Sequence, residues 1–407
     1  MSRPLGNARL RAARQAKGYR SQQDLADALT ASGLTVSGRQ VRRWESDNPP
    51  LPYPDLQRAL VELLGVTSIE DLGFPAGPGA DAGRVLRTPP AGPMTVPNAI
   101  QPASAASAFA AVTRAHRRLY WTVAPATLHP SVAAHATLGG ALLPATAGVI
   151  RRTVASALAE SWLLAGRIEF FDLSEPGRAR ETWLRALQAA GDADDALLGA
   201  AILAHTAFVP GWAGDRAGAA ERMAMARTSA RRGPASAELL AWLDAVEAEC
   251  ETRCGNTRTA LNLIAHGEDL LAAGGDDPSS SPDWMDWFSA VRLAAFKGNV
   301  QLRAGHLPQA RETLLGVMAD LPADADKQMT VVLGDLAAVE AAAGQPEAAC
   351  DFAIRALDLL ETHWYATGME RVREVRRELA QWQGEPCVRA LDDRLFSWSA
   401  MLSALAN

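Results

Sequence analysis

A repeat of about 40 residues constrains the fold of this chain more than any other feature of its sequence. The hexapeptide ARETWL at 179–184 returns as ARETLL at 310–315, and three further segments align with these two on one alanine. The aligned alanines lie at spacings of 40, 41, 50 and 39 residues: Ala179, Ala219, Ala260, Ala310 and Ala349. In four of the five units a glycine lies five residues before the alanine: Gly214, Gly255, Gly305 and Gly344.

This pattern predicts helical hairpins that stack side by side. A glycine at that position can end a helix in the left-handed conformation and let the chain reverse. The small alanine then lets the second helix of the hairpin approach the first. Residues 103–407 are rich in Ala, Leu, Glu and Arg and show little β-strand alternation, so we expect helix after helix. Each hairpin leaves an apolar face for its neighbour, and the result is an α-solenoid.

One unit carries a family resemblance. In LGDLAAVEAAAGQPEAACDFAIRAL (333–357), small and large residues fall as they do in tetratricopeptide repeats. The resemblance implies an all-α fold in which 103–407 form a tetratricopeptide-like helical repeat domain. The longest unit contains the insertion GGDDPSSSPDWMDWF (274–288). We expect its Trp284 and Trp287 to be either packing residues of an irregular loop or ligand contacts.

Residues 1–74 predict a separate domain. Seven prolines and four glycines fall within 75–102, which predicts a flexible linker without a core of its own. Capping and helix-ending residues before the linker predict five helices, at 7–17, 21–33, 37–46, 55–64 and 69–72. The chain has a formal net charge of −6, yet residues 1–44 hold nine basic and two acidic side chains. A basic end on an acidic body favours a polyanionic partner.

The helix predicted at 37–46 separates into two faces. At about 100° per residue, Val41 and Trp44 fall on one side of the helix. Arg39, Arg42 and Arg43 fall on an arc of about 100° on the opposite side, and Gln40 flanks them. Arginine forks pair with guanine N7 and O6 in the DNA major groove, and glutamine amides pair with adenine. We therefore expect this helix to recognise DNA, with Ser37 as its N-cap.

The segments SQQDLADAL, VSGRQVRRWES and LQRALVELLGV together resemble the helix-turn-helix domain of phage-repressor type, the Xre family. The resemblance implies that Gln22 contacts phosphate and braces the third helix. It also implies that Arg39, Gln40 and Arg43 contact bases and that Arg42 holds the DNA backbone. Ala26 and Ser37 lie farther apart than in the tight form of the motif, so we expect a longer second helix or turn.

The full layout is similar to that of actinobacterial regulators with an Xre-type domain, a Pro/Gly linker and a helical repeat region. It implies a sequence-specific transcription regulator with double-stranded DNA as a partner. The repeat region would then form a homodimer, or bind a peptide or small-molecule effector or a protein partner. A second hypothesis is a protein-interaction scaffold, in which the repeat region does the main work and the N-terminal unit binds protein rather than DNA.

Other functional classes lack their motifs in this sequence. We find no nucleotide-binding glycine loop, no Gly-x-Ser-x-Gly and no His-Glu-x-x-His, so we expect no enzyme and no cofactor. Cys250 and Cys254 have the spacing of metal ligands, but no second pair follows, and buried cysteines are the favoured interpretation. No apolar run is long enough to span a bilayer and no signal peptide is evident, which predicts a cytoplasmic protein with no membrane partner.

Overall fold

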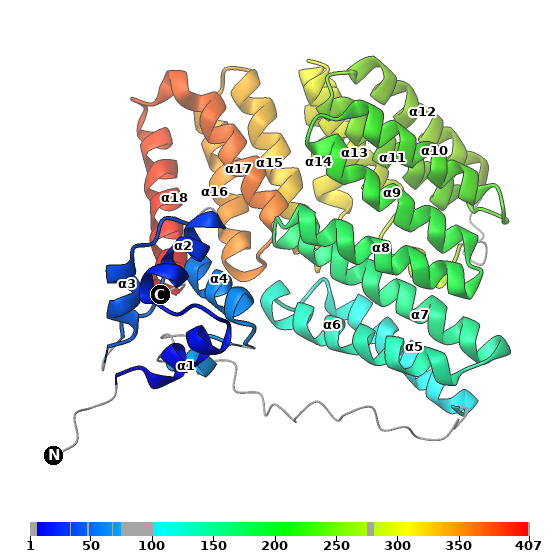
Figure 1. The fold of residues 1–407 in the computed structure, drawn as a ribbon. Helices are drawn as coiled ribbons and strands as arrows, with labels where there is room; N and C mark the ends of the chain where they lie inside the picture. Colours follow the sequence, from blue (N-terminus) through cyan, green and yellow to red (C-terminus); the bar gives the residue numbers. More distant parts are fainter. Residues whose placement is uncertain are drawn as a thin grey trace. The chain divides into compact units, whose positions relative to one another are not determined.

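The computed structural model describes residues 6–32, 34–46, 49–66, 68–74, 101–274 and 281–405, and these contain helices and no strand. The all-α fold expected from the sequence is therefore confirmed for this part of the chain (Figure 1). The described residues form two compact units: one holds the described residues up to 74 together with 401–405, and the other holds those from 101 to 400. Most of the predicted flexible linker, 75–102, lies outside the described residues.

In the N-terminal unit the described residues form four α-helices and one short 3₁₀ turn: α1 (Ala8–Ala16), α2 (Gln22–Ala31), α3 (Gly38–Trp44), α4 (Pro54–Leu64) and η1 (Glu70–Leu72). The order matches the sequence prediction, but the fifth element is a single 3₁₀ turn rather than an α-helix. The predicted second and third helices each end two residues early, at Ala31 and Trp44. One apolar cluster of α1–α4 and η1 side chains, including Leu10, Leu29 and Leu60, forms the core of the unit.

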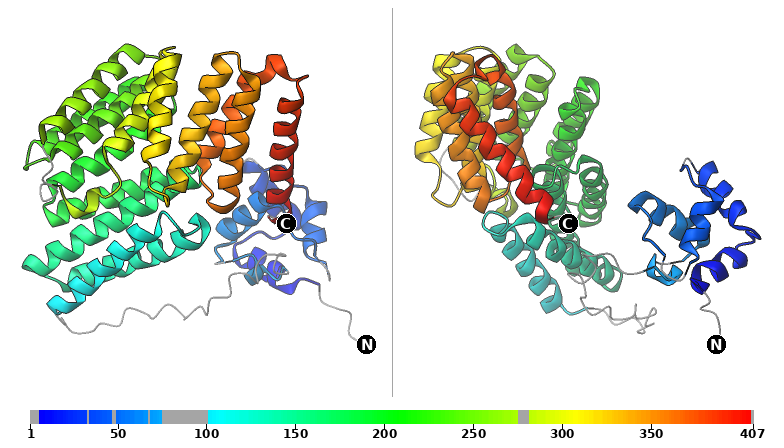
Figure 2. Two further views of the ribbon diagram at one scale, coloured as in Figure 1. Left: turned by 180° about the vertical axis from the view of Figure 1, so that it is seen from behind. Right: turned by 90° about the vertical axis from the view of Figure 1, so that its left-hand side faces the viewer.

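The second unit is an array of helical hairpins (Figures 1 and 2). It begins with α5 (Ala103–Leu119) and α6 (Pro125–Leu142), which pack against the first hairpin. The first helices of the six hairpins are α7 (Gly148–Arg167), α9 (Ala196–Trp212), α11 (Ala237–Arg253), α13 (Ala290–Arg303), α15 (Asp326–Ala342) and α17 (Ala366–Glu378). The second helices are α8 (Pro176–Ala193), α10 (Arg216–Ala230), α12 (Thr257–Gly274), α14 (Leu307–Asp320), α16 (Pro346–Thr362) and α18 (Pro386–Leu405).

Four short elements connect these helices: η3 (Leu143–Ala145), the π-helix η4 (Ile168–Asp172), η5 (Asp283–Met285) and η6 (Leu379–Trp382). From α7 to α15, each first helix packs against its own second helix and against the first helix of the next hairpin. This is the packing expected of a tetratricopeptide-like solenoid.

The residues that define the sequence repeat have the predicted structural roles. The five aligned alanines lie in the second helices of successive hairpins, and each is at most 3% exposed. The four glycines lie between paired helices, and each has a positive φ of 73–83°. In the unit of Ala179 the same position is Ser174, which also has a positive φ, 57°. The turn therefore needs a left-handed residue in every unit, whether or not it is glycine.

Gly305→Ala and Gly316→Ala are expected to change stability in opposite directions. Gly305 has a φ of 79°, and a Cβ there would meet no heavy atom within 4 Å, so its cost is conformational and about 1 kcal/mol. Gly316 lies exposed inside α14, also with open space around it, and alanine should gain about 1 kcal/mol of helix propensity there. Thermal unfolding of both variants measures the difference, and shifts of the same sign would contradict the left-handed turn.

Candidate functional site

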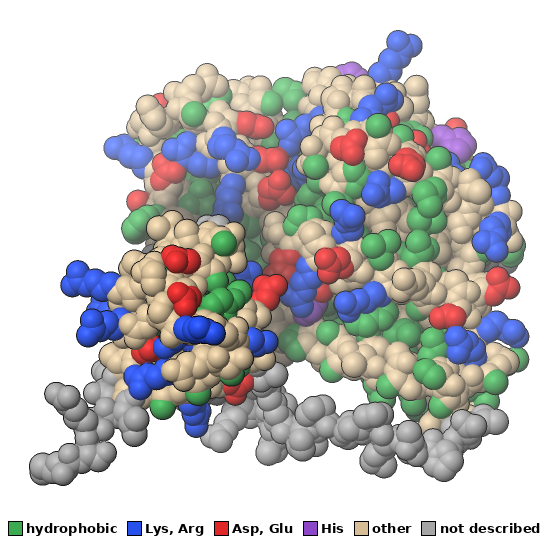
Figure 3. All heavy atoms as spheres, in the orientation of Figure 1, with side chains coloured by type: hydrophobic (Ala, Val, Ile, Leu, Met, Phe, Trp, Pro, Cys, Tyr) green, Lys and Arg blue, Asp and Glu red, His purple; other side chains and the backbone are tan. Residues whose placement is uncertain are grey.

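The third helix of the N-terminal unit presents the arginine face that the sequence predicts. Val41 and Trp44 are buried, at 0% and 2% exposure, and pack in the core of the unit. Arg39, Arg42 and Arg43 are all exposed. The two faces of α3 thus separate as the helical wheel predicts. Lys and Arg side chains, blue in Figure 3, project from the edge of this unit where Figure 1 labels α3.

The three guanidinium groups on this face are free. Within the described part of the chain, the side chains of Arg39, Arg42 and Arg43 make no hydrogen bond and no ion pair. Gln40 is half-buried beside them, and its backbone N–H bonds to the Ser37 hydroxyl at 3.3 Å. Ser37 is therefore the N-cap of α3, as predicted. Fifteen forked N–H donors on one short helix are thus available to an external acceptor.

The connection before α3 is longer than the helix-turn-helix motif requires, and the structure places the extra residues in the turn. The second helix ends at Ala31 with Ser32 as its C-cap, and Ser37 caps the start of α3. The Thr30 hydroxyl accepts from the Val36 N–H at 3.4 Å and donates to the Ala26 carbonyl at 2.8 Å. Val36 is only 7% exposed. These contacts tie the end of the long turn to α2 and so position the start of α3.

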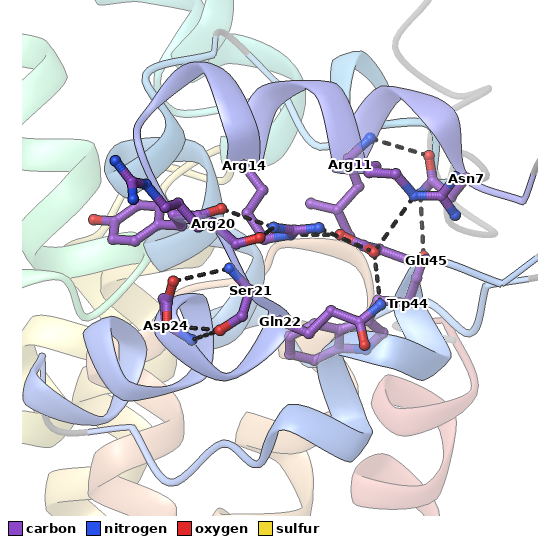
Figure 4. Close-up of polar contacts among 11 residues, drawn as sticks. Asn7, Arg11, Arg14, Arg20, Ser21, Gln22, Asp24, Trp44 and Glu45 are labelled. Carbon is purple, nitrogen blue, oxygen red and sulfur yellow. Dashed lines mark hydrogen bonds and ion pairs between the residues drawn. The ribbon is translucent and has the colours of Figure 1, made fainter.

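A buried carboxylate fixes the other end of α3. Glu45, the C-cap residue, is 4% exposed and accepts a hydrogen bond from Arg14 Nε at 2.7 Å (Figure 4). Arg14, itself 4% exposed, also donates to the carbonyls of Tyr19 and Arg20, at 2.7 and 3.1 Å. The Arg11 side chain lies 3.7 Å from the same carboxylate. Arg14 of α1 is thus connected to the end of α3 by an ion pair and to the α1–α2 turn by hydrogen bonds.

Gln22 belongs to this network. Its side-chain amide donates to Glu45 Oε2 at 2.8 Å, so α2 braces the end of α3 through a hydrogen bond. Gln22 begins α2, which is capped by Ser21 and Asp24: the Ser21 N–H bonds to Asp24 at 2.8 Å, and the Asp24 N–H bonds to the Ser21 hydroxyl at 3.1 Å. The phosphate contact that the resemblance implies for Gln22 remains a prediction.

The electrostatics of Glu45 keep the network ionised at neutral pH. Burial alone would raise the pKa of its carboxyl group. Hydrogen bonds from Arg14 and Gln22, with the positive charges of Arg14 and Arg11, outweigh burial and hold this pKa below its ordinary value. The carboxylate is therefore charged at pH 7, and its pairing with Arg14 holds α3 in a defined orientation.

The contact between Glu45 and Arg14 joins residues 31 positions apart, and the sequence did not predict it. A glutamate directly after the buried Trp44, with arginines spaced along the first predicted helix, was the available signal. Neither a protein-family model nor a curated protein matches the chain.

Two other sequence predictions concern metals and membranes. Cys250 is 3% exposed with its Sγ 3.6 Å from the Ala207 carbonyl, and Cys254 is half-buried. The described residues hold no group of three His, Cys, Asp or Glu side chains arranged for a metal ion. None of the described helices combines the length and the apolar character needed to cross a membrane.

Proposed function

We propose that this chain is a sequence-specific transcription regulator that binds double-stranded DNA through α3. The observation that carries the proposal is the exposed face of α3, where the side chains of Arg39, Arg42 and Arg43 have no partner within the described residues. A helix fits the DNA major groove, and forked arginines match the acceptors of guanine and of phosphate there.

Rigid support of that face favours DNA recognition over a solvated basic surface. Val41 and Trp44 anchor one side of α3 in the core, and Glu45 ties its end to Arg14 and Gln22. Recognition of base edges needs side chains that are held in fixed positions. A helix that is anchored at both ends holds its side chains in this way. In this proposal Arg39, Gln40 and Arg43 contact bases, while Arg42 and Gln22 contact phosphates.

The repeat unit would supply the other functions of a regulator. It would form a homodimer, so that two N-terminal units bind a two-fold symmetric operator, or it would bind an effector or a protein partner. The proposal assigns the chain no catalytic role and places it in the cytoplasm, where bacterial DNA is accessible.

Selection from a random duplex library with the full chain tests the proposal. We expect a defined sequence motif to be enriched, and its affinity to fall steeply with salt because arginine–phosphate contacts release counterions. Two such contacts already predict about a tenfold loss in affinity between about 50 and 200 mM salt. If no motif is enriched, or if binding is independent of salt, the protein does not act as a sequence-specific DNA-binding regulator.

A further inference from the structure

The hairpin array lines a partly open cavity with a volume of about 100 Å³. Its wall comes from the first helices of the six hairpins, at the end of α7 and along α9, α11, α13, α15 and α17.

Contacts between the two ends of the array help to close the cavity. The Thr367 hydroxyl donates to the Phe171 carbonyl at 3.0 Å, and the Trp364 indole donates to the Asp172 carbonyl at 2.9 Å. Lys327 Nζ lies 2.6 Å from Asp172 Oδ1. Phe171 and Asp172 belong to the π-helix η4, which directly follows Arg167. This irregular turn therefore joins the first hairpin to the last two.

Much of the cavity wall is aromatic. Trp242 lies against the His205 ring at a centroid distance of 4.7 Å, and Trp287 lies 6.1 Å from Trp242. Phe208 and Trp212 of α9 complete this side of the cavity. The His205 Nδ1 is 2.8 Å from the Ala201 carbonyl, and burial lowers the pKa of His205 to about 3, so its ring is neutral at pH 7. This wall suits a flat apolar ring system.

Arg167 lies on the cavity wall without an anionic partner. It is 8% exposed, and its guanidinium stands 4.8 Å from the Trp287 ring centroid and 4.9 Å from that of Tyr120. No hydrogen bond or ion pair reaches it within the described residues. A buried charge without a counter-ion is costly, and an anionic ligand would relieve that cost.

Arg292 is a second guanidinium of this kind. It pairs with the Tyr365 hydroxyl, and among the described residues no carboxylate lies within ion-pair distance. Burial lowers the pKa of Arg292, and the positive charge of Arg167 lowers it further, although Tyr365 opposes this. The two arginines therefore repel each other, and both would gain from an anion placed between them.

The remaining charges of the cavity are already paired. Arg371 lies 3.2 Å from Asp335 and 3.5 Å from both Glu249 and Glu374. Asp335 also accepts from Asn299 at 3.0 Å. The unpaired charge in the cavity is thus the positive charge of Arg167 and Arg292.

Two indole N–H groups on the wall also lack acceptors. Trp212 Nε1 and Trp287 Nε1 are buried and make no hydrogen bond within the described residues. Buried polar groups are normally paired, and these two are donors, like the arginines. The cavity therefore offers unused donors beside aromatic surface.

We propose that the cavity binds a small organic monoanion with a planar aromatic body, such as an aromatic carboxylate. Its anionic group pairs with Arg167 and Arg292, its ring packs among the tryptophans, and a further acceptor on it takes an indole N–H. The site deepens the proposed function, because an effector would bind here. Its test uses no DNA, so failure of the site and failure of DNA recognition are distinguishable.

The test compares two fluorescent probes that differ only in charge. 8-Anilinonaphthalene-1-sulfonate carries an anionic group, and N-phenyl-1-naphthylamine has the same ring system without it. We expect the full chain to bind one sulfonate dye with a blue-shifted emission, at least about tenfold more tightly than the neutral dye, because charge-assisted hydrogen bonds add to ring burial. Naphthalene-2-carboxylate should displace the sulfonate. Equal affinity for the two dyes, or several weak sites, overturns the proposal.

Variants assign the binding to the two arginines. We expect Arg167→Gln and Arg292→Gln each to weaken sulfonate binding by at least about tenfold. Affinity for the neutral dye should stay unchanged in both variants. Unchanged binding of the neutral dye also shows that the cavity is folded. Arg118 of α5 is exposed and has no side-chain partner among the residues that the structure describes, so Arg118→Gln removes the same charge and should change the affinity for neither dye. Unchanged sulfonate binding in both cavity variants overturns the assignment. A short peptide ending in phenylalanine that displaces the dye more tightly than naphthalene-2-carboxylate overturns the small-molecule ligand.

Discussion

Replacing Arg39 and Arg43 together by alanine is expected to abolish sequence-specific DNA binding by the full chain while leaving its fold intact. Both side chains are exposed and make no hydrogen bond or ion pair within the described residues, so truncation removes no internal contact. A forked arginine–guanine contact is worth about 1–3 kcal/mol, so losing two should lower affinity by about 30-fold or more. Fluorescence anisotropy with a labelled duplex carrying the selected motif measures this loss.

Two controls separate base recognition from general attraction to DNA. Changing Arg39 and Arg43 to lysine keeps both charges but removes the planar forks, so preference for the motif should fall while salt-dependent binding to random DNA persists. Changing Arg9 and Arg58 to alanine removes two charges elsewhere in the unit, and this variant should keep the preference. If the variant with Arg39 and Arg43 changed to alanine binds the motif as tightly as the unaltered chain, α3 is not the recognition helix.

Glu45→Ala is expected to destabilise the N-terminal unit by about 3–5 kcal/mol, the cost of breaking a buried ion pair from one side. The change leaves the Arg14 guanidinium 4% exposed without its carboxylate, and Gln22 loses its acceptor. Hydrogen–deuterium exchange of the full chain should show faster exchange in α1, α2 and α3. Glu62→Ala removes an exposed carboxylate of α4 and should change exchange little, because surface substitutions are usually within about 0.5 kcal/mol.

The same contact predicts how the N-terminal unit responds to acid. The pKa of Glu45 is lower in the folded state than its ordinary value. Its contribution to stability is therefore fully present above the unfolded-state pKa of about 4.3, and it is lost as pH falls through the folded-state pKa. The protection of amides in α1–α3, corrected for the intrinsic slowing of exchange in acid, should fall over this acidic range in the unaltered chain and less so in Glu45→Gln. Identical pH profiles for the two proteins would contradict the charged state of Glu45.

The sequence was most informative where structure depends on neighbours along the chain. Gly214 and Gly255 predict their left-handed turns because only glycine adopts that conformation at little cost. Val41 and Trp44 predict the buried face of α3 because three residues make nearly one helical turn. The same short-range sequence pattern overestimates the length of the third helix by two residues at its end. Its last turn is replaced by the C-cap at Glu45, whose side chain is held by Arg14 from another helix.

Sequence patterns over a few residues do not predict the cavity. The sequence does not decide whether Trp284 and Trp287 are packing residues or ligand contacts. The structure buries both, at 6% and 7% exposure, and places Trp287 on the cavity wall. No sequence pattern marks Arg167 or Arg292, which are two among many arginines. They matter because, among the residues that the structure describes, no carboxylate lies within ion-pair distance of either guanidinium. Only the folded structure shows this.

The sequence by itself determined an all-α chain of repeated hairpins, preceded by a helix with an arginine face, because turns and helix faces depend on residues a few positions apart. Only the tertiary structure decided that Glu45 pairs with Arg14 and that Arg167 and Arg292 line one aromatic cavity. Residues 14 and 45, or 167 and 292, are brought together by the stacking of whole helices. Such stacking sums small packing terms over many residues, and no short segment encodes it.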